Sequence, residues 1–207
     1  MAIETLRQLQ PYHLDVLTEI GNIGSGNAAT ALASMMNTTV EIAIPNITLV
    51  DYEEVAALLG GSDATAIGIS LDITGDISGM ILHVLHTDFA DKLINTFYPA
   101  QISTLNDIQE MDMSVISEMG NITSAAYVNA LAKLTGLFIN ISPPDSQRDT
   151  IRQILDDSAA AMPEMSRQVL FIDEKLIIGG SKINCGLILM LEMESLKILF
   201  DHLGVSY

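Results

Sequence analysis

The sequence predicts an α+β fold built from two duplicated halves, with an antiparallel sheet that carries the long helices on one face. The first observation is a repeat, because EIGNIGSGNAATALA from Glu19 has a counterpart 99 positions later, EMGNITSAAYVNALA from Glu118. The second is that each half runs from a long helical pattern into strands joined by short turns. Since strands and helices do not alternate, the helices should gather on one face of an antiparallel sheet. We expect a pseudo-two-fold relation between the halves.

The elements of the two halves follow the same order: a long helix, a β-branched strand, and a hairpin of two further strands. Their expected ranges are 12–36, 40–44 and 64–85 in the first half, and 111–135, 138–142 and 168–192 in the second. The repeats span about residues 12–99 and 111–206. At 207 residues the chain has the size of a single domain, so one domain spanning 1–207 is expected.

One segment is expected in the second half alone. Residues 146–162, SQRDTIRQILDDSAAAM, predict an additional helix with a narrow apolar stripe formed by Ile151, Ile154 and Leu155. Charged side chains are available on its polar side, among them Asp149, Arg152 and Asp156. Because the duplicated core does not need this helix, it is either a lid over open sheet or a site with a separate role.

Composition and charge exclude several classes of function. Apolar residues make up 49% of the chain, which favours a folded protein over a disordered one. Nine Lys plus Arg against 26 Asp plus Glu give a net charge of -17, which argues against binding to nucleic acid or to an anionic membrane. No apolar run approaches the roughly 18 residues of a membrane helix, and the N-terminal sequence lacks a signal-peptide pattern. We therefore expect no membrane insertion and a cytoplasmic location.

Cysteine and histidine usage predicts no metal centre. Cys185 is the single cysteine, so an internal disulfide cannot form, and its apolar neighbours suggest a buried side chain. The four histidines are scattered and lack a neighbouring carboxylate or thiol cluster.

A polar stripe recurs on the two long helices. At about 100° per residue, the same side of each helix carries Asp15, Glu19 and Asn22, and Ser114, Glu118 and Asn121. We call Glu19 with Asn22, and Glu118 with Asn121, the two Glu–Asn pairs. The opposite side is predicted to be buried and includes Ile23 and Leu134 among its apolar residues.

The Glu–Asn pairs invite two interpretations. A solvated face commonly carries Glu and Asn, but Asn is a poor helix former and its return at the same register calls for a reason. Mostly small residues continue the stripe, and they would let a partner backbone approach closely: Gly26, Ala29 and Ala33, and then Ala125, Val128 and Ala132. We favour a functional surface.

The spacing of the stripe resembles that of the CheC family of chemotaxis phosphatases. The pattern is Asp or Ser, three residues, Glu, two residues, Asn, and twenty-two residues to a Pro, which is Pro45 in the first half and Pro144 in the second. The resemblance covers nearly the whole chain. It implies a phosphatase that dephosphorylates the phosphoaspartate of the response regulator CheY.

The resemblance also implies roles for the stripe residues. Asn22 and Asn121 would orient the attacking water, Glu19 and Glu118 would hold the regulator through its lysine, and Asp15 and Ser114 would support each site at its rim. The magnesium ion would belong to the regulator, so this chain is expected to bind no metal or cofactor.

A second partner is implied by the same family. It binds CheD, a receptor glutamine deamidase, through the region of the 146–162 helix, so Asp149, Ile151 and Arg152 are expected at that contact. The alternative to an enzyme is a non-catalytic module that binds CheY or CheD and regulates it.

Overall fold

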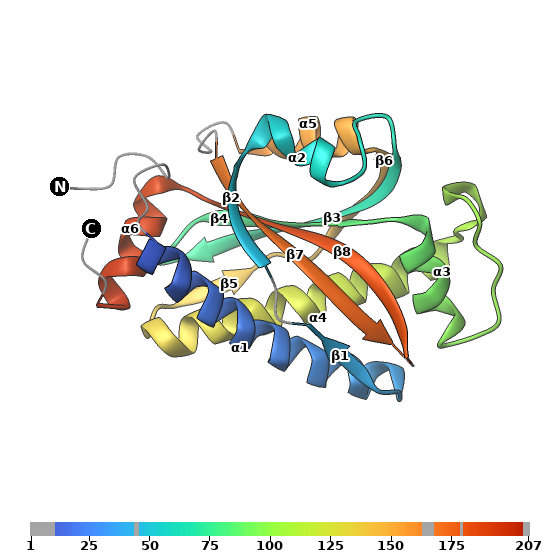
Figure 1. The fold of residues 1–207 in the computed structure, drawn as a ribbon, viewed down its shortest axis with the longest axis horizontal. Coiled ribbons are helices and arrows are strands. Elements are labelled where there is room, and N and C mark those ends of the chain that lie inside the picture. The colour runs from blue at the N-terminus through green and yellow to red at the C-terminus, as the bar shows by residue number, and fades with distance from the viewer. Residues whose placement is uncertain (1–10, 44–45, 163–167, 179, 205–207) are drawn as a thin grey trace.

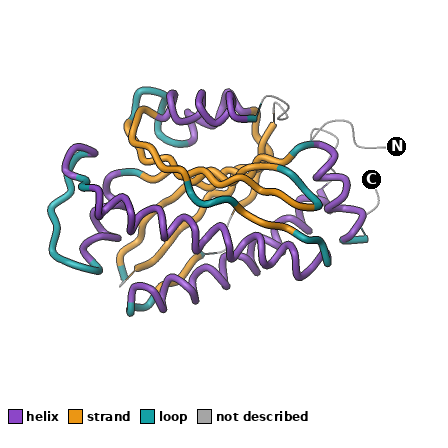
Figure 2. Tube along the Cα trace, turned by 180° about the vertical axis from the view of Figure 1, so that it is seen from behind, coloured by secondary structure: helices purple, strands orange, loops and turns teal. Residues whose placement is uncertain are grey.

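A computed structural model describes residues 11–43, 46–162, 168–178 and 180–204. An eight-stranded antiparallel sheet forms its central layer, with helices on both faces (Figures 1 and 2). The strands are β1 (Val40–Ile42), β2 (Asn46–Asp51), β3 (Thr65–Gly75), β4 (Gly79–Leu85), β5 (Ile139–Ile141), β6 (Asp145–Thr150), β7 (Gln168–Ile178) and β8 (Ser181–Leu191). Their order is β1-β7-β8-β4-β3-β5, and β2 also pairs with β7, as β6 does with β3. The predicted α+β class is confirmed.

The helices divide between the two faces of the sheet. The long helices α1 (Pro11–Met36) and α4 (Glu110–Thr135) lie side by side on one face and run in opposite directions (Figure 1). The shorter α2 (Tyr52–Leu58) and α5 (Ile151–Ala161) cover the other face. Helices α3 (Thr87–Asn95) and α6 (Met193–His202) and the 3-10 turn η2 (Leu105–Asp107) complete the fold. None of the helices in these ranges is long and apolar enough to cross a membrane.

Alternation along the strands builds a core on each face. On β7, Leu170 and Ile172 pack beneath the long helices, whereas Val169 and Phe171 pack beneath α2 and α5. Both faces of the central strands are therefore apolar, and all seven residues of β4 are buried.

The expectation of a helix unique to the second half is wrong. Strand β6 and helix α5 have counterparts 99 positions earlier in β2 and α2. The first copy was not recognised in the sequence because α2 has only seven residues, against 11 in α5. It is followed by Gly60 and Gly61, whose backbones have positive φ angles. In the second copy, residues 146–150 were predicted as the start of the helix but belong to strand β6. This strand, DSQRDT, is polar and has no apolar alternation.

The buried arc of the long helices also differs from the prediction. Ile23 and Leu134 are exposed, at 36% and 44%, while Val128 of the small-residue track is buried. The helices pack against each other as well as on the sheet, so no single apolar stripe defines the buried side. Polar Ser25, Thr123 and Ser124 take part in the buried arc instead.

Candidate functional site

The two Glu–Asn pairs lie on the solvent-facing side of the helix pair. Glu19 and Glu118 are exposed, and Asn22 and Asn121 are half-buried at the same register. Because α1 and α4 are antiparallel, the pairs lie on opposite sides of the contact that Gly24 makes with Tyr127. The structure thus brings Glu and Asn together within each helix and keeps the two pairs apart as separate sites.

The two pairs differ in their hydrogen bonds. In the second, Asn121 Nδ2 donates to Glu118 Oε2 at 3.4 Å. In the first, Asn22 Oδ1 is buried and has no hydrogen-bond partner among the described residues. A buried acceptor without a donor is unfavourable by about 1–3 kcal/mol, so the first amide is held at an energetic cost that the second avoids.

The residues at the rim of each pair are both exposed. Ser114 Oγ donates to the Glu110 carbonyl oxygen at 3.1 Å, which ties it to the preceding turn of α4. Asp15 is exposed one turn before Glu19. These positions permit the supporting roles that the resemblance implies.

A buried polar cluster joins α1, α4 and β7 beneath this surface. Ser25 Oγ donates to Glu174 Oε1 at 3.1 Å and lies 2.6 Å from Tyr127 Oη, and the Tyr127 hydroxyl donates to the same carboxyl oxygen. Cys185 Sγ lies 3.9 Å from the other oxygen. Burial raises the pKa of Glu174 to about 7, although the hydrogen bonds from Ser25 and Cys185 act in the opposite direction.

A second buried contact joins α4 to β4. His83 Nε2 lies 2.8 Å from Ser124 Oγ and 3.4 Å from Thr123 Oγ1. Burial lowers the pKa of His83 to about 4, so the imidazole is neutral at physiological pH. Ser25 and Ser124 occupy the same register in the two repeats, and each reaches a buried titratable group of the sheet.

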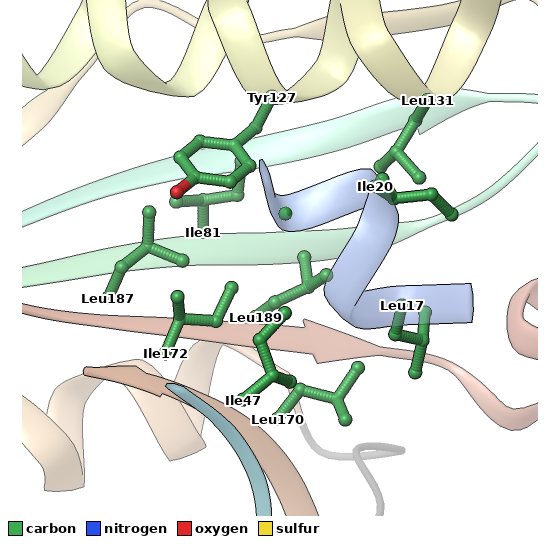
Figure 3. Close-up of a pocket in the computed structure, with 11 residues that line it drawn as sticks. Leu17, Ile20, Ile47, Ile81, Tyr127, Leu131, Leu170, Ile172, Leu187 and Leu189 are labelled. Carbon is green, nitrogen blue, oxygen red and sulfur yellow. The ribbon is translucent and has the colours of Figure 1, made fainter. Parts of the chain in front are cut away.

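An apolar cavity of about 30 Å³ lies between α1, α4 and the sheet (Figure 3). Its walls are aliphatic apart from Tyr127, whose hydroxyl is bonded to Glu174. A water molecule needs two to four polar partners, so this void is expected to be dry. Leu17, Ile20 and Gly21 line it from α1, directly before Asn22 in the sequence.

Both repeats match a known family of proteins. Residues 13–49 and 111–147 each match the model of the CheC-like family, and each segment contains one Glu–Asn pair. In both repeats the chain is therefore similar to the CheC-like family.

Relatives of this CheC-like chain include two named phosphatases of Bacillus subtilis. It is 25% identical over 197 residues to the CheY-P phosphatase CheC, covering 93% of this chain and 94% of the relative. It is 27% identical over 149 residues to the flagellar motor switch phosphatase FliY, covering 69% of this chain and 37% of FliY. A solved structure of Thermotoga maritima FliY has a TM-score of 0.72 at 21% identity, covering 95% of this chain and 98% of that one, which shows the shared fold.

The residues expected to contact a second partner fall in two groups. Asp149, on β6, and Arg152, on α5, are exposed, and Arg152 lies 3.6 Å from the Asp63 carboxylate. Ile151 is fully buried in the core between α5 and the sheet, so its expected place at a partner surface is wrong. The apolar stripe of α5 faces the sheet, because α5 covers β3 and β4 in the way that α2 covers β7.

The buried cluster is what sequence reasoning missed. Ser25 and Ser124 recur at the same place in the repeat, but no role for them was predicted from the sequence. Glu174 alternates in phase with the β7 residues that face the long helices, and this phase is the signal in the sequence that could have predicted its buried position.

Among the described residues, no three His, Cys, Asp or Glu side chains are grouped to hold a metal. Pro45 lies outside the described residues, and Pro144 lies between β5 and β6.

Proposed function

We propose that this CheC-like protein hydrolyses the phosphoaspartate of the response regulator CheY. The observation that carries the proposal is the presence of two solvent-facing Glu–Asn pairs at one register, each inside a segment that matches the family. The names of the B. subtilis relatives, CheY-P phosphatase CheC and FliY, support the same activity.

In this reaction the main task of the phosphatase is to position the attacking water. Water attacks the phosphorus while the bond to the aspartate oxygen breaks, leaving a free carboxylate and inorganic phosphate. The regulator's own magnesium ion would neutralise the phosphoryl oxygens. An amide both donates and accepts hydrogen bonds, so Asn22 or Asn121 can orient the water in line with the phosphorus.

The carboxylates suit a docking role. Glu19 and Glu118 are exposed and can pair with a lysine of the regulator through a charge-assisted hydrogen bond. The bound regulator would then place its phosphoaspartate over the neighbouring Asn. Because CheY is the substrate in this proposal, we place the protein in the cytoplasm.

One assay separates the enzyme from a binding module. Phosphate release from magnesium-loaded phospho-CheY would be followed with and without this protein. Release well above the regulator's own rate supports the phosphatase. Saturable binding of phospho-CheY with unchanged release would instead support the non-catalytic module.

We further propose that the charged surface around Asp149 and Arg152 binds the deamidase CheD. Both side chains are exposed, Asp149 on β6 and Arg152 on α5, the helix that covers the sheet face opposite the long helices. Asp149→Lys should weaken CheD binding and leave phosphate release intact, whereas Glu41→Lys, at an exposed site on β1, serves as the control. Equal CheD affinity for both variants and wild type would exclude this surface.

A further inference from the structure

The buried carboxyl of Glu174 sits where both long helices meet the sheet. It is 1% exposed, and its Oε1 accepts hydrogen bonds from Ser25 on α1 and Tyr127 on α4. One oxygen atom of β7 therefore joins the two helices that carry the Glu–Asn pairs. Ser25 lies one helical turn after Asn22, so the contact acts close to the first pair.

The neutral form of Glu174 fits its surroundings. The titratable groups that face it are Tyr127 of α4 and Cys185 of β8, while α1 contributes the Ser25 hydroxyl. Its neighbours on β7, Asp173 and Lys175, alternate to the opposite face of the sheet. The charged side chains described on α1 and in the middle and last turns of α4 are exposed: Asp15, Glu19, Glu118 and Lys133. Without a facing cation, burial favours the protonated carboxyl more strongly than water does.

Packing by itself leaves α1 incompletely fixed on the sheet. The apolar cavity lies under Leu17, Ile20 and Gly21, so close contacts are missing beneath the turn that leads to Asn22. One turn further on, the Tyr127 ring fills the space over Gly24, where a Cβ atom would come within 2.5 Å of Tyr127 Cδ1. The polar contact of Ser25 and Tyr127 with Glu174 thus lies where the helices approach each other closely.

We propose that Glu174 is a positioning residue that, through Ser25 and Tyr127, sets how α1 and α4 lie relative to each other and so how the two Glu–Asn pairs meet the regulator. This inference rests on the proposed phosphatase function. A shift of about 1 Å in a positioning group can cost roughly 10²-fold in rate, so a small movement of α1 would be measurable.

The test compares two substitutions of similar size. Glu174→Gln keeps an acceptor for both hydroxyls and should retain the wild-type acceleration of phosphate release. Glu174→Leu removes the acceptor and should lower the acceleration by at least about tenfold. Val84→Ala is the control, because it truncates a buried side chain on the sheet face opposite the long helices. If Val84→Ala loses as much acceleration as Glu174→Leu, Glu174 acts only through stability and the proposal fails.

A second readout does not depend on activity. Spin labels at Ser34→Cys and Lys133→Cys, both exposed sites, report the distance between α1 and α4. Cys185 is buried with a raised thiol pKa, so it should resist labelling. Glu174→Leu should shift or broaden the distance distribution, and Glu174→Gln should not. An unchanged distribution in Glu174→Leu overturns the proposal. A changed distribution in a protein whose wild type lacks phosphatase activity would preserve the positioning role and reject the proposed function.

For Tyr127 the milder substitution is Phe, which keeps the ring over Gly24 and removes one hydrogen bond to Glu174. It provides the same comparison if Glu174→Leu does not fold. Loss of acceleration in Tyr127→Phe, with the wild-type response in Val84→Ala, supports the proposal. Equal activity of Tyr127→Phe and wild type with an unchanged distance overturns it.

Discussion

Asn121 Nδ2 donates a hydrogen bond to Glu118 Oε2 across one turn of α4, at 3.4 Å, whereas Asn22 Oδ1 is buried without a hydrogen-bond partner among the described residues. The second Glu–Asn pair therefore has one hydrogen bond in place before any regulator arrives, whereas the oxygen of the first amide would gain a partner only on binding. Order in the free protein reduces the entropy lost on docking.

We accordingly predict unequal contributions from the two amides. Asn121→Ala should reduce phosphate release from phospho-CheY more than Asn22→Ala does, and the double variant should fall to the regulator's own rate. Steady-state release at matched regulator concentrations checks the order. Equal losses in the two single variants would show that the hydrogen bond to Glu118 does not influence activity.

The same substitutions should separate stability from activity. Asn22→Ala removes a buried, unpartnered oxygen and introduces the best helix former, so it should raise the free energy of unfolding by about 1 kcal/mol. Urea denaturation measures this change. Asn121→Ala, which loses a weak bond on a more exposed amide, should gain less.

Gly24 and Gly26 form a matched pair on α1. A Cβ at Gly24 would come within 2.5 Å of the Tyr127 ring, so Gly24→Ala should destabilise the protein by about 1–3 kcal/mol. A Cβ at Gly26 would meet nothing within 4 Å, and Gly26→Ala should stabilise the helix by about 1 kcal/mol. Thermal unfolding of both variants tests the prediction, and similar midpoints would contradict the close contact at Gly24.

Two buried titratable groups should oppose each other in the pH dependence of stability. Glu174 has a pKa of about 7 in the fold against 4.5 for a free glutamate, so the folded state binds the extra proton and stability falls as pH rises through this window. His83 has a pKa of about 4 against 6.5, so the unfolded state binds the extra proton and stability rises with pH from 4 to 6.5. Their contributions largely cancel between pH 4.5 and 6.5.

Removing one group should therefore reveal the other. Glu174→Gln should leave a stability that rises by about 3 kcal/mol between pH 4 and 6.5, and His83→Gln a stability that falls by a similar amount between pH 4.5 and 7. Denaturant unfolding at closely spaced pH values measures both slopes. Two variants with the wild-type profile would show that neither group titrates in this range.

The carboxylates of the Glu–Asn pairs should contribute affinity and little chemistry. Glu19→Gln together with Glu118→Gln should weaken binding of phospho-CheY, because each loses a charged partner for a lysine. Calorimetry should also show that wild-type affinity decreases with added salt more steeply than that of the double variant. Unchanged affinity with lost activity would move the two glutamates into the chemical step.

Periodicity and the repeat were sufficient to predict the long helices, the hairpins and the solvent-facing side of the Glu–Asn pairs. They succeeded because Glu19 and Glu118 belong to 26-residue helices, whose spacing is regular over seven turns. The repeat also indicated which positions to compare between the halves.

Ile23 was assigned wrongly to the buried side, because a residue four positions after Glu19 lies on nearly the same side of the helix, and it is exposed. Tertiary packing determined the rest of what could not be predicted. Glu174 accepts hydrogen bonds from Ser25 and Tyr127, which are distant from it in sequence. This contact depends on the placement of β7 beneath both long helices, so it could not be predicted from the sequence. Strand β6 lacked an apolar alternation, so its pairing with β3 could not be read from the sequence.

The pairing of β4 with β8 at the centre of the sheet has a consequence for the origin and the unfolding of the molecule. Gly79 pairs with Leu191, and Val84 pairs with Gly186, so exchanging the two halves maps this ladder onto itself. Such self-complementary contact is what joins identical subunits in an isologous dimer. The arrangement is therefore the one that two half-length subunits would form in a symmetric dimer. Since each half alone would expose the backbone edge of a fully buried strand, neither should persist without the other, and the chain should unfold in one cooperative transition.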